Sequence, residues 1–363
     1  MVSNYILIIA IILSFGNNSS IDSVAYNQEI NTSLSKVFKD SFDIGAAVSN
    51  SFTNSSEVKN ILKTHFTSIT AENEMKPESL LKKNGGYNWR QADAIIDFAR
   101  KNKIKVRGHT LLWHKQTPSW FFTDAKNRNL TKEGLYLKQF NYMKSVMNHF
   151  DYIKVWDVVN EAITDNNNSN QIFRTKNSKW FEICGEEFIE KAFIMAHSIG
   201  PDKKLFYNDY NLLNKKKQDR VFQMLKNLID KGVPIHGVGI QAHWTIYDSI
   251  SDIENLIMRF STLNLEIHIT ELDLSVFKKN DKSLKSEYVF NGSEEEKQAK
   301  LYGKIFKIFN KHKDKISNVS FWGISDKESW LNNHPVKGRR NYPLLFDDYF
   351  EPKKNFFSIT NIN

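Results

Sequence analysis

The feature that most constrains the fold is a repeated alternation between short apolar runs and longer amphipathic segments. The apolar runs have the length and composition of buried strands. Eight of them occur, at residues 42–48, 68–73, 105–113, 152–161, 204–211, 236–244, 265–274 and 318–325. Helix candidates lie between them, at 57–65, 89–101, 131–150, 180–199, 215–231, 251–263 and 293–310. This alternation predicts an α/β fold, a single-domain (β/α)8 TIM barrel.

A doubly wound open sheet is the alternative arrangement of alternating strands and helices. Such a sheet commonly has a glycine-rich turn after its first strand, but no G-x-G-x-x-G or P-loop pattern follows any of the apolar runs. The 363 residues could form two domains, yet no Pro-, Ser- or Gly-rich linker and no repeat of fixed period divides the chain. The barrel in one large domain is therefore favoured.

Several helix candidates carry end patterns with a physical basis. Ser251 with Glu254, and Ser293 with Glu296, fit the capping box, in which both side chains satisfy unpaired N–H groups of the first turn. Gly200, followed by a proline, is typical of a helix end. These patterns predict that two helices begin at the serines and that one ends just before the glycine.

The formal net charge of +9 arises from lysine-rich segments such as 215–217, 278–279 and 311–315. They are spread along the chain, as is typical of solvated helix faces and loops. None of the known nucleic-acid-binding modules is recognisable, so we expect no nucleic-acid partner. A basic surface remains compatible with an acidic polymer as substrate.

Residues 5–15 form an apolar run that is shorter than the roughly 20 residues needed to cross a bilayer. The run predicts a signal peptide over residues 1–25, with Ser23-Val24-Ala25 as the best cleavage motif. The mature protein would then be secreted to the extracellular space, with no membrane association. No Lys or Arg precedes the run, so a retained membrane anchor is the alternative.

Two of the predicted strands end in a glutamate. The stretch V-W-D-V-V-N-E-A (155–162) delivers Asn160 and Glu161, and E-I-H-I-T-E-L-D-L (266–274) delivers Glu271. A lone glutamate in such a place is more often a local cap. Because the C-terminal ends of all strands in a barrel converge on the face that carries the active site, two of them suggest paired carboxylates at a common site.

Polar and aromatic side chains also gather at the other strand ends, and buried polar groups need partners, so packing alone explains them poorly. Carboxylates, amides and aromatic rings together suit carbohydrates, which offer hydroxyls and apolar ring faces. Hydrolysis of a glycosidic bond needs one carboxylic acid to protonate the leaving oxygen and one carboxylate to attack or stabilise the sugar cation. The environments of these two groups must give them different pKa values, so that one is protonated while the other is ionised.

A metal-dependent hydrolase is the rival hypothesis, because His109, His114, His243 and His268 are available. No H-x-H or H-E-x-x-H pattern is present, and the odd spacing between the first two histidines would direct them to opposite faces of one strand. We therefore predict no metal site and no cofactor.

Six motifs, in order along the chain, resemble glycoside hydrolase family 10, the endo-β-1,4-xylanases. They are T-A-E-N-E-M-K (70–76), R-G-H-T-L-L-W-H (107–114), W-D-V-V-N-E-A (156–162), G-I-Q-A-H-W (239–244), I-T-E-L-D (269–273) and F-W-G-I-S-D-K-E-S-W (321–330). The resemblance spans residues 35–358, which we expect to form the catalytic barrel domain.

This resemblance implies hydrolysis of the xylan backbone in two steps with retention of configuration. Glu161 resembles the general acid/base and Glu271 the nucleophile that forms a covalent xylosyl-enzyme. The residues themselves indicate the pair without assigning these roles, because the separation of the carboxylates is not visible in a sequence.

The resemblance also implies substrate-binding residues. Asn160 would bond the hydroxyl next to the reacting carbon, His243 backed by Asp273 would hold Glu271, and Tyr210 would stack on a sugar on the leaving-group side. The glycone-side pocket would contain Glu72, Asn73, Lys76, His109, Trp113, Gln241, Trp322 and Trp330.

Some positions depart from the family pattern. Pro77 occupies a place where the family often has Trp, which leaves the neighbouring donor-side contacts open. The Asn-rich loop 165–170 and the Lys-rich segment 276–290 are expected over the cleft, where they could alter substrate preference. His268, inside the seventh strand, is expected to be buried and structural.

The expected partners are xylan and xylo-oligosaccharides, bound by a monomer. Another retaining barrel glucanase, such as a cellulase, would use the same two glutamates. A catalytically silent xylan-binding protein is the alternative from a different functional class.

Overall fold

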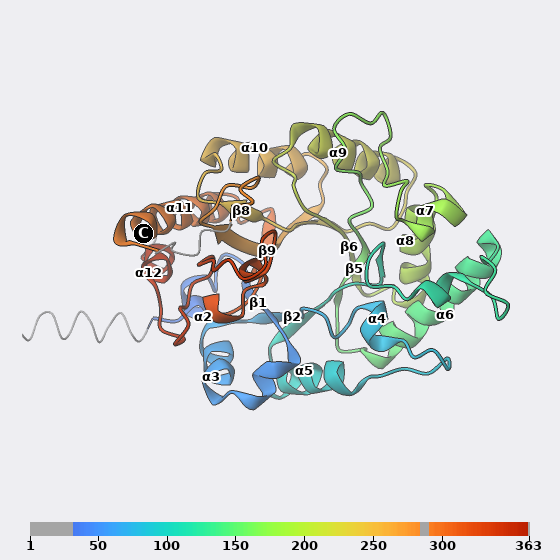
Figure 1. Cartoon of the computed structure of the whole chain (residues 1–363), viewed down its shortest axis with the longest axis horizontal. Helices are drawn as coiled ribbons and strands as arrows, with labels where there is room; N and C mark the ends of the chain where they lie inside the picture. Colours follow the sequence, from blue (N-terminus) through green and yellow to red (C-terminus); the bar gives the residue numbers. More distant parts are fainter. Residues whose placement is uncertain (1–31, 284–289, 362–363) are drawn as a thin grey trace, which may run out of the picture. The chain divides into compact units, whose positions relative to one another are not determined.

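The computed structural model describes residues 32–283 and 290–361, so the predicted signal peptide lies outside the described residues. In the described part, ten β-strands form one sheet (Figure 1). They are β1 (Asp43–Val48), β2 (Ser68–Ala71), β3 (Lys105–Gly108), β4 (Leu112–Trp113), β5 (Val155–Asn160), β6 (Lys204–Asp209), β7 (Gly237–Ile240), β8 (His243–Thr245), β9 (Glu266–Ser275) and β10 (Ile316–Phe321).

The sheet closes on itself. Its order is β1-β2-β3-β5-β6-β7-β9-β10, and β10 pairs again with β1. Every one of these pairings is parallel. The short strands β4 and β8 pair with β5 and β9, beyond the ends of β3 and β7. Eight parallel positions in a closed ring confirm the predicted (β/α)8 barrel.

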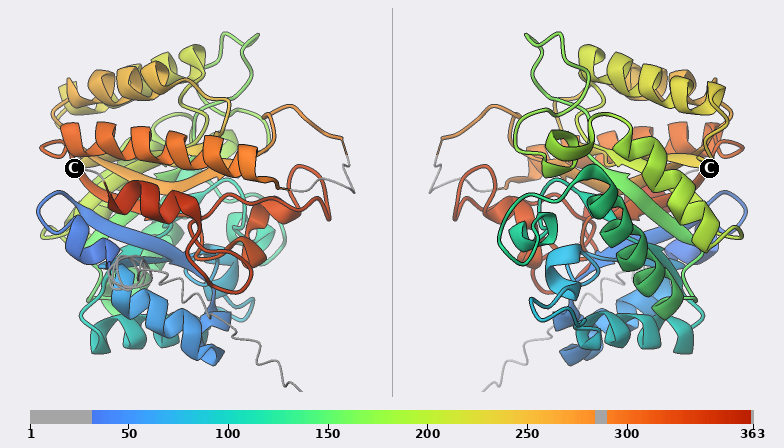
Figure 2. Two further views of the ribbon diagram at one scale, coloured as in Figure 1. Left: turned by 90° about the vertical axis from the view of Figure 1, so that its left-hand side faces the viewer. Right: turned by 90° about the vertical axis from the view of Figure 1, so that its right-hand side faces the viewer.

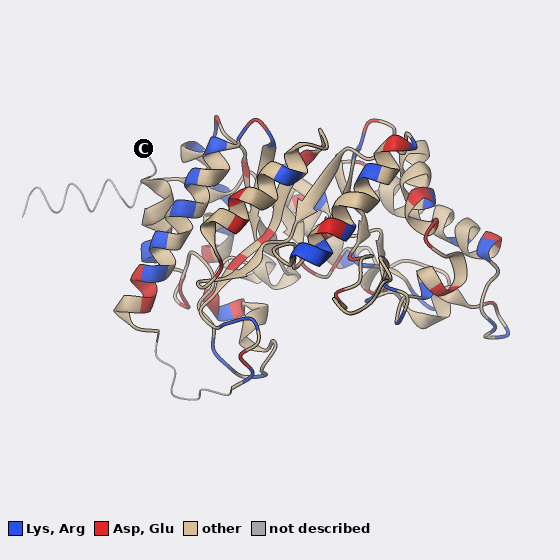
Figure 3. Ribbon diagram, turned by 90° about the horizontal axis from the view of Figure 1, so that it is seen from above, with Lys and Arg blue, Asp and Glu red and all other residues tan. Residues whose placement is uncertain are grey.

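Helices surround the barrel (Figures 1 and 2). They are α2 (Leu34–Val37), α3 (Ser56–His65), α4 (Pro77–Leu80), α5 (Arg90–Lys101), α6 (Lys132–His149), α7 (Lys179–Cys184), α8 (Phe188–Ile199), α9 (Lys215–Asp230), α10 (Ile250–Ser261), α11 (Gly292–Lys311) and α12 (Lys354–Thr360). Apolar side chains at helical spacing form the inner face of a typical helix, as Ala92, Ile95, Ile96 and Ala99 do in α5. Lys and Arg positions are interspersed with Asp and Glu positions along the helices (Figure 3).

Two predicted strands are interrupted. The segment predicted at 105–113 divides into β3 and β4, and the segment at 236–244 divides into β7 and β8. The first break follows Gly108, where an added Cβ would lie 2.2 Å from the Trp156 ring. The second coincides with Ala242, whose φ of +60° turns the backbone out of the extended conformation. Both breaks lie within apolar runs that are continuous in the sequence, so the sequence pattern does not predict them.

The helix ends partly differ from the prediction. The segment predicted at 180–199 divides into α7 and α8 at Gly185, which has a φ of +66°. α8 ends at Ile199 before Gly200, as predicted.

Both predicted capping boxes are wrong. Ser249, not Ser251, caps α10 by accepting from the Asp252 N–H, and Asn291 caps α11. An equivalent oxygen two residues upstream lets each helix begin earlier, and the sequence pattern does not rank the two candidates.

Among the described residues, no helix combines the length and apolar character required to span a membrane.

Candidate active site

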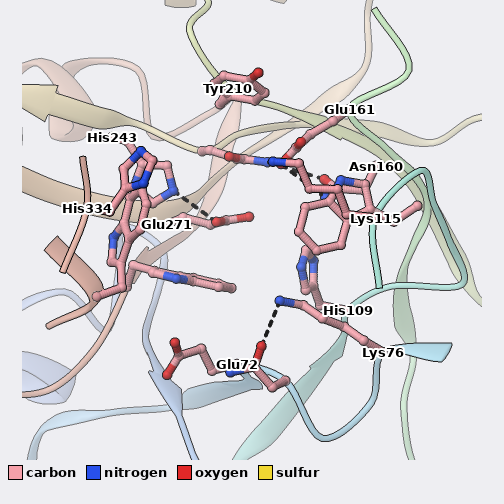
Figure 4. A pocket seen from close by; sticks show the side chains of 15 residues that line it. Glu72, Lys76, His109, Lys115, Asn160, Glu161, Tyr210, His243, Glu271 and His334 are labelled. Atoms are coloured by element: carbon pink, nitrogen blue, oxygen red, sulfur yellow. Dashed lines mark hydrogen bonds and ion pairs between the residues drawn. The ribbon is translucent and has the colours of Figure 1, made fainter. Parts of the chain in front are cut away.

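A cavity of about 440 Å³ lies at the C-terminal ends of the strands (Figure 4). It is lined by Glu72, Asn73, Lys76, His109, Trp113, Lys115, Asn160, Glu161, Tyr210, Gln241, His243, Glu271, Trp322, Trp330 and His334. The structure thus brings together every candidate catalytic and substrate-binding residue predicted from the sequence. Asp273, predicted as a supporting residue, lies directly behind His243.

Glu271, on β9, is a buried carboxylate with two hydrogen-bond donors. Asn208 Nδ2 donates to its Oε1 at 2.9 Å, and His243 Nε2 lies 3.1 Å from its Oε2. Burial alone would raise the pKa of Glu271, but the hydrogen bond from His243 and the electrostatic interactions with His109 and His243 lower it overall. Glu271 is therefore held in its ionised form.

His243 is itself held by Asp273. The distance from His243 Nδ1 to Asp273 Oδ2 is 2.9 Å, and Trp330 Nε1 donates to the same oxygen at 2.9 Å. Burial would lower the pKa of His243, but Asp273 and then Glu271 outweigh burial and raise it to about 10. The ring is therefore a cation at neutral pH, and both of its nitrogens donate.

Glu161 follows the last residue of β5 and has a φ of +56°, a left-handed conformation that few residues other than glycine adopt. Its backbone N–H donates to the Asn208 carbonyl at 2.9 Å, which fixes this turn on β6. Gln241 Nε2 donates to its carboxylate at 3.2 Å. The Asn160 carboxamide lies beside it, within hydrogen-bonding distance of Asn208 and Gln241. The turn directs Glu161 into the cavity that Glu271 also lines.

A lysine and a glutamate face each other across the opposite side of the cavity. Lys76 donates to Asn73 Oδ1 at 3.1 Å, and its ammonium lies 4.9 Å from the centre of the Trp113 ring. Burial lowers the pKa of Lys76, although attraction to Glu271 and Glu72 opposes this shift. Burial likewise raises the pKa of Glu72 against the attraction of Lys76. This wall offers both donors and acceptors to hydroxyl groups.

His109 is pinned in the same way as His243, by a buried aspartate. Its Nδ1 lies 2.9 Å from Asp157 Oδ2, and its ring meets the edge of Trp322 with 5.6 Å between centroids. Asp157 also accepts two hydrogen bonds from Arg107. Burial would raise the pKa of Asp157, but Arg107 and His109 lower it overall.

Tyr210 forms the rim above Glu161 (Figure 4). Its hydroxyl donates to Asp165, and the Lys217 ammonium lies 3.6 Å from the centre of its ring. Lys217 has no exposed side-chain surface and contacts both Asp165 and Asp209 at 2.8 Å. Burial would raise the pKa of Asp165, but Lys217 lowers it to about 2.

The polar loop 165–170, expected over the cleft, is attached to this cluster. Arg174 donates to Asp165 at 2.8 Å, and Arg220 donates to the Asn166 and Ser169 carbonyls. The Lys-rich segment also reaches the rim, because Lys279 donates to Asn211 Oδ1 at 2.7 Å, next to Tyr210. Residues 284–289 of that segment lie outside the described residues.

Sequence reasoning missed four residues of the site. Asn208 and Asp157 lie in strand segments that the sequence predicts, but only their spatial neighbours reveal that they hold Glu271 and His109. Lys115 and His334 come from loops and carry no motif of their own. His334 stacks on Trp330 with 4.9 Å between centroids. His268 is buried, as expected.

The four histidines weighed as metal ligands do not come together as a ligand set. Within residues 32–283 and 290–361, no group of three or more His, Cys, Asp or Glu side chains has the spacing of a metal site. Only His109 and His243 of the four line the cavity.

The chain matches the model of "Glycosyl hydrolase family 10" over residues 33–362. It is 44% identical to the "Beta-1,4-xylanase" of Dictyoglomus thermophilum, covering 98% of this chain and 97% of that protein. It is 42% identical to the "Endo-1,4-beta-xylanase A" of Caldicellulosiruptor saccharolyticus, covering 91% and 96%.

A solved structure of the xylanase XynB from Paenibacillus barcinonensis, in complex with a conduramine derivative, superposes with a TM-score of 0.86. The two chains are 39% identical, with 91% and 98% covered. The family match over nearly the whole described chain confirms the resemblance that the six motifs indicated. The chain therefore belongs to glycosyl hydrolase family 10 and is a glycoside hydrolase.

Proposed function

We propose that this protein is an endo-1,4-β-xylanase that hydrolyses internal β-1,4 bonds of xylan with retention of configuration and without a cofactor. The observation that carries the proposal is the pair of glutamates, Glu161 and Glu271, on one cavity lined with amides and aromatic rings. The names of the relatives, a β-1,4-xylanase and an endo-1,4-β-xylanase, support the substrate.

In this proposal Glu271 is the nucleophile. Its lowered pKa and its two donors, Asn208 and His243, keep it ionised and aimed. Glu161 protonates the glycosidic oxygen while a Glu271 oxygen bonds to the anomeric carbon, so the leaving sugar departs with a hydroxyl. Glu161, now a carboxylate, takes a proton from water, whose oxygen displaces Glu271 and regenerates both groups.

The other pocket residues divide between the two sides of the bond. Tyr210 offers the leaving-group sugar the ring face that Lys217 does not cover, and the hydrogen bond to Asp165 fixes the orientation of the ring. Asn160 bonds the hydroxyl next to the reacting carbon. The glycone side comprises Glu72, Asn73, Lys76, His109, Trp113, Gln241, Trp322 and Trp330, in which carboxylate, amide and ammonium groups pair with sugar hydroxyls.

The first test measures reducing ends released from linear xylan and, in parallel, from a soluble cellulose derivative, with Glu271→Gln as the blank. Short xylo-oligosaccharides from xylan alone are expected. Preference for the cellulose derivative would instead identify a glucanase. Binding of xylan without release from either polymer would identify a binding protein.

A second test separates the roles of the two glutamates. Glu161→Gln should retain activity on an aryl β-xylobioside with a very good leaving group, because departure then needs no proton, whereas Glu271→Gln should not. Added azide should restore turnover in Glu161→Gln, since an anion needs no general base. Equal loss of activity in both variants on this substrate would contradict the assignment.

We also propose export by the apolar segment at residues 5–15 and function as a monomer. N-terminal sequencing of the protein recovered from culture medium would test cleavage near residue 25. Retention in the membrane fraction would favour the anchor. Sedimentation equilibrium would test the oligomeric state.

A further inference from the structure

A line of buried polar side chains runs from the cavity into the barrel, beneath His109. Asp157 on β5 holds His109, Arg107 on β3 holds Asp157, and His268 on β9 contacts Arg107. Glu266, at the start of β9, lies 3.1 Å from His268 Nε2 and ends the line. All except Glu266 are almost completely buried, so no solvent replaces a lost contact.

The chemistry of arginine determines each donor in this line. A guanidinium only donates, so His268 Nδ1 must accept from Arg107 Nη1. The His268 proton then lies on Nε2 and is donated to Glu266 Oε1. At the other end, Arg107 Nε and Nη2 donate to the two oxygens of Asp157. The position of His268 therefore affects how Arg107 meets Asp157.

Packing fixes the same geometry. The Phe206 ring on β6 lies 4.3 Å from the centre of the His268 ring, and Arg107 lies over the same phenyl ring at 4.8 Å. Glu266 is held in turn by Lys204 on β6 and Ser317 on β10. His268 is thus enclosed by side chains from β3, β6 and β9, and the charged groups that face it are Arg107, Glu266 and Asp157.

We propose that His268 is a positioning residue for the active site, acting through Arg107 and Asp157 on the orientation of His109. The orientation of His109 matters because its electrostatic interaction with Glu271 contributes to the lowered pKa of that carboxylate. The effect on hydrolysis rests on the proposed role of Glu271 as nucleophile. The effect of His268 on the orientation of His109 rests only on the contacts that join them through Arg107 and Asp157.

A neutral His268 suits this role. Burial and the charge of Arg107 lower its pKa, against Glu266 and Asp157, to about 4. Its Nδ1 lone pair therefore stays available to Arg107 through the neutral range.

Two variants distinguish a positioning role of the His268 side chain from a role in which it only fills space in the core. His268→Asn keeps an oxygen acceptor near the place of Nδ1, whereas His268→Leu leaves the Arg107 N–H without a partner. His268→Leu should lose on the order of tenfold in kcat/KM on xylan, because small displacements of reacting groups are costly. The acid limb of its pH profile should move to higher pH, because Glu271 loses part of the stabilisation of its charge. His268→Asn should stay close to the wild type in kcat/KM and in the position of the acid limb.

A measurement without substrate tests the same contacts. In protein with ¹⁵N-labelled histidine at pH 7, His268 should carry its proton on Nε2, and the ¹⁵N shifts of His109 should change in His268→Leu but not in His268→Asn. Thermal unfolding would verify that both variants are folded at the assay temperature.

A proton on His268 Nδ1, or unchanged His109 shifts in His268→Leu, would overturn the proposal. So would an unmoved acid limb in a folded, active His268→Leu protein. Absence of xylan hydrolysis by the wild type would count against the proposed function only, since the histidine spectra are recorded without substrate.

Discussion

The two pocket histidines, His109 and His243, are each pinned through Nδ1 by a buried aspartate, but the aspartates differ in their other partners. Asp157 shares its charge with Arg107, whereas in the described part of the chain the side chain of Asp273 accepts only from the neutral Trp330 N–H besides His243. Asp273 can therefore stabilise a full positive charge on its histidine, and His243 gains a pKa of about 10.

This charge predicts a pH-dependent contribution to stability. The folded-state pKa of His243 is raised above the ordinary value of 6.5, so its stabilisation is complete below about pH 6.5 and is lost as pH rises through about 10. Asp273→Asn removes the main attraction. The difference in Tm between the wild type and this variant should be largest near pH 6 and should narrow by pH 10. About 1 kcal/mol corresponds to roughly 2 °C in a domain of this size.

Thermal unfolding followed by circular dichroism at a series of pH values measures this difference. His243→Gln, which removes the titrating group, should reproduce the narrowing. A constant difference across the range would show that the ion pair does not titrate as described.

At the scale of elements, the side chain of Asp165 attaches the start of the loop 165–170 to three other segments, in addition to the hydrogen bonds from Arg220 to the loop backbone. Asp165 receives Lys217 from the first turn of α9, Arg174 from the segment after the loop, and Tyr210 from the end of β6. A loop of polar residues would be expected to vary in conformation. Here the ion pairs attach the loop to Tyr210 at the rim of the cavity, next to the proposed leaving-group side.

Asp165→Asn should loosen this attachment. It leaves buried Lys217 with Asp209 as its remaining carboxylate and should destabilise the fold by roughly 2 kcal/mol, below the usual cost of breaking a fully buried pair because Asp165 is partly exposed. KM on xylan should rise more than kcat falls, since the hydrogen bond that positions Tyr210 loses the charge of its acceptor. Denaturant unfolding and steady-state kinetics measure the two effects.

Asn168→Ala, at the exposed part of the same loop, is the matched control and should leave both quantities near the wild type. Equal behaviour of the two variants would argue against a clamp at Asp165.

At the scale of the whole molecule, closure of the barrel requires small residues where side chains from neighbouring strands fill the interior. An added Cβ at Gly108 would lie 2.2 Å from Trp156, and one at Gly237 would lie 2.1 Å from Phe206. Both rings are fully buried. Each glycine on one strand thus makes room for a ring on the next.

Gly108→Ala should therefore destabilise the barrel by about 1–3 kcal/mol, because Trp156 must shift in a packed interior. Activity should also fall, since His109 follows directly in the chain. Gly292→Ala is the control, because nothing lies within 4 Å of an added Cβ there and its φ is not positive. Denaturant unfolding compares the two, and a smaller loss at Gly108 than at Gly292 would refute the packing argument.

The sequence by itself determined the class of fold, the order of strands and helices, and the convergence of the two glutamates on one face. It could do so because burial imposes periodicity on apolar residues, and because parallel strands in a barrel bring their C-terminal ends to one face whatever lies between them. Glu161 and Glu271, 110 positions apart, were predicted neighbours for this reason. The resemblance to the family supplied the other cavity residues, apart from Lys115 and His334.

Only the tertiary structure decided how these residues are held. The contact of Asn208 with Glu271 and the ion pair of Asp165 with Lys217 each join side chains that are distant in the sequence. The ends of β3 and β7, inside longer apolar runs, are likewise set by the tertiary structure. A hydrogen bond or ion pair is specified by a few tenths of an ångström, whereas a pattern along one chain specifies only which face a residue occupies. The chemistry of the pocket was therefore predictable in kind, and its electrostatic balance was set by the fold.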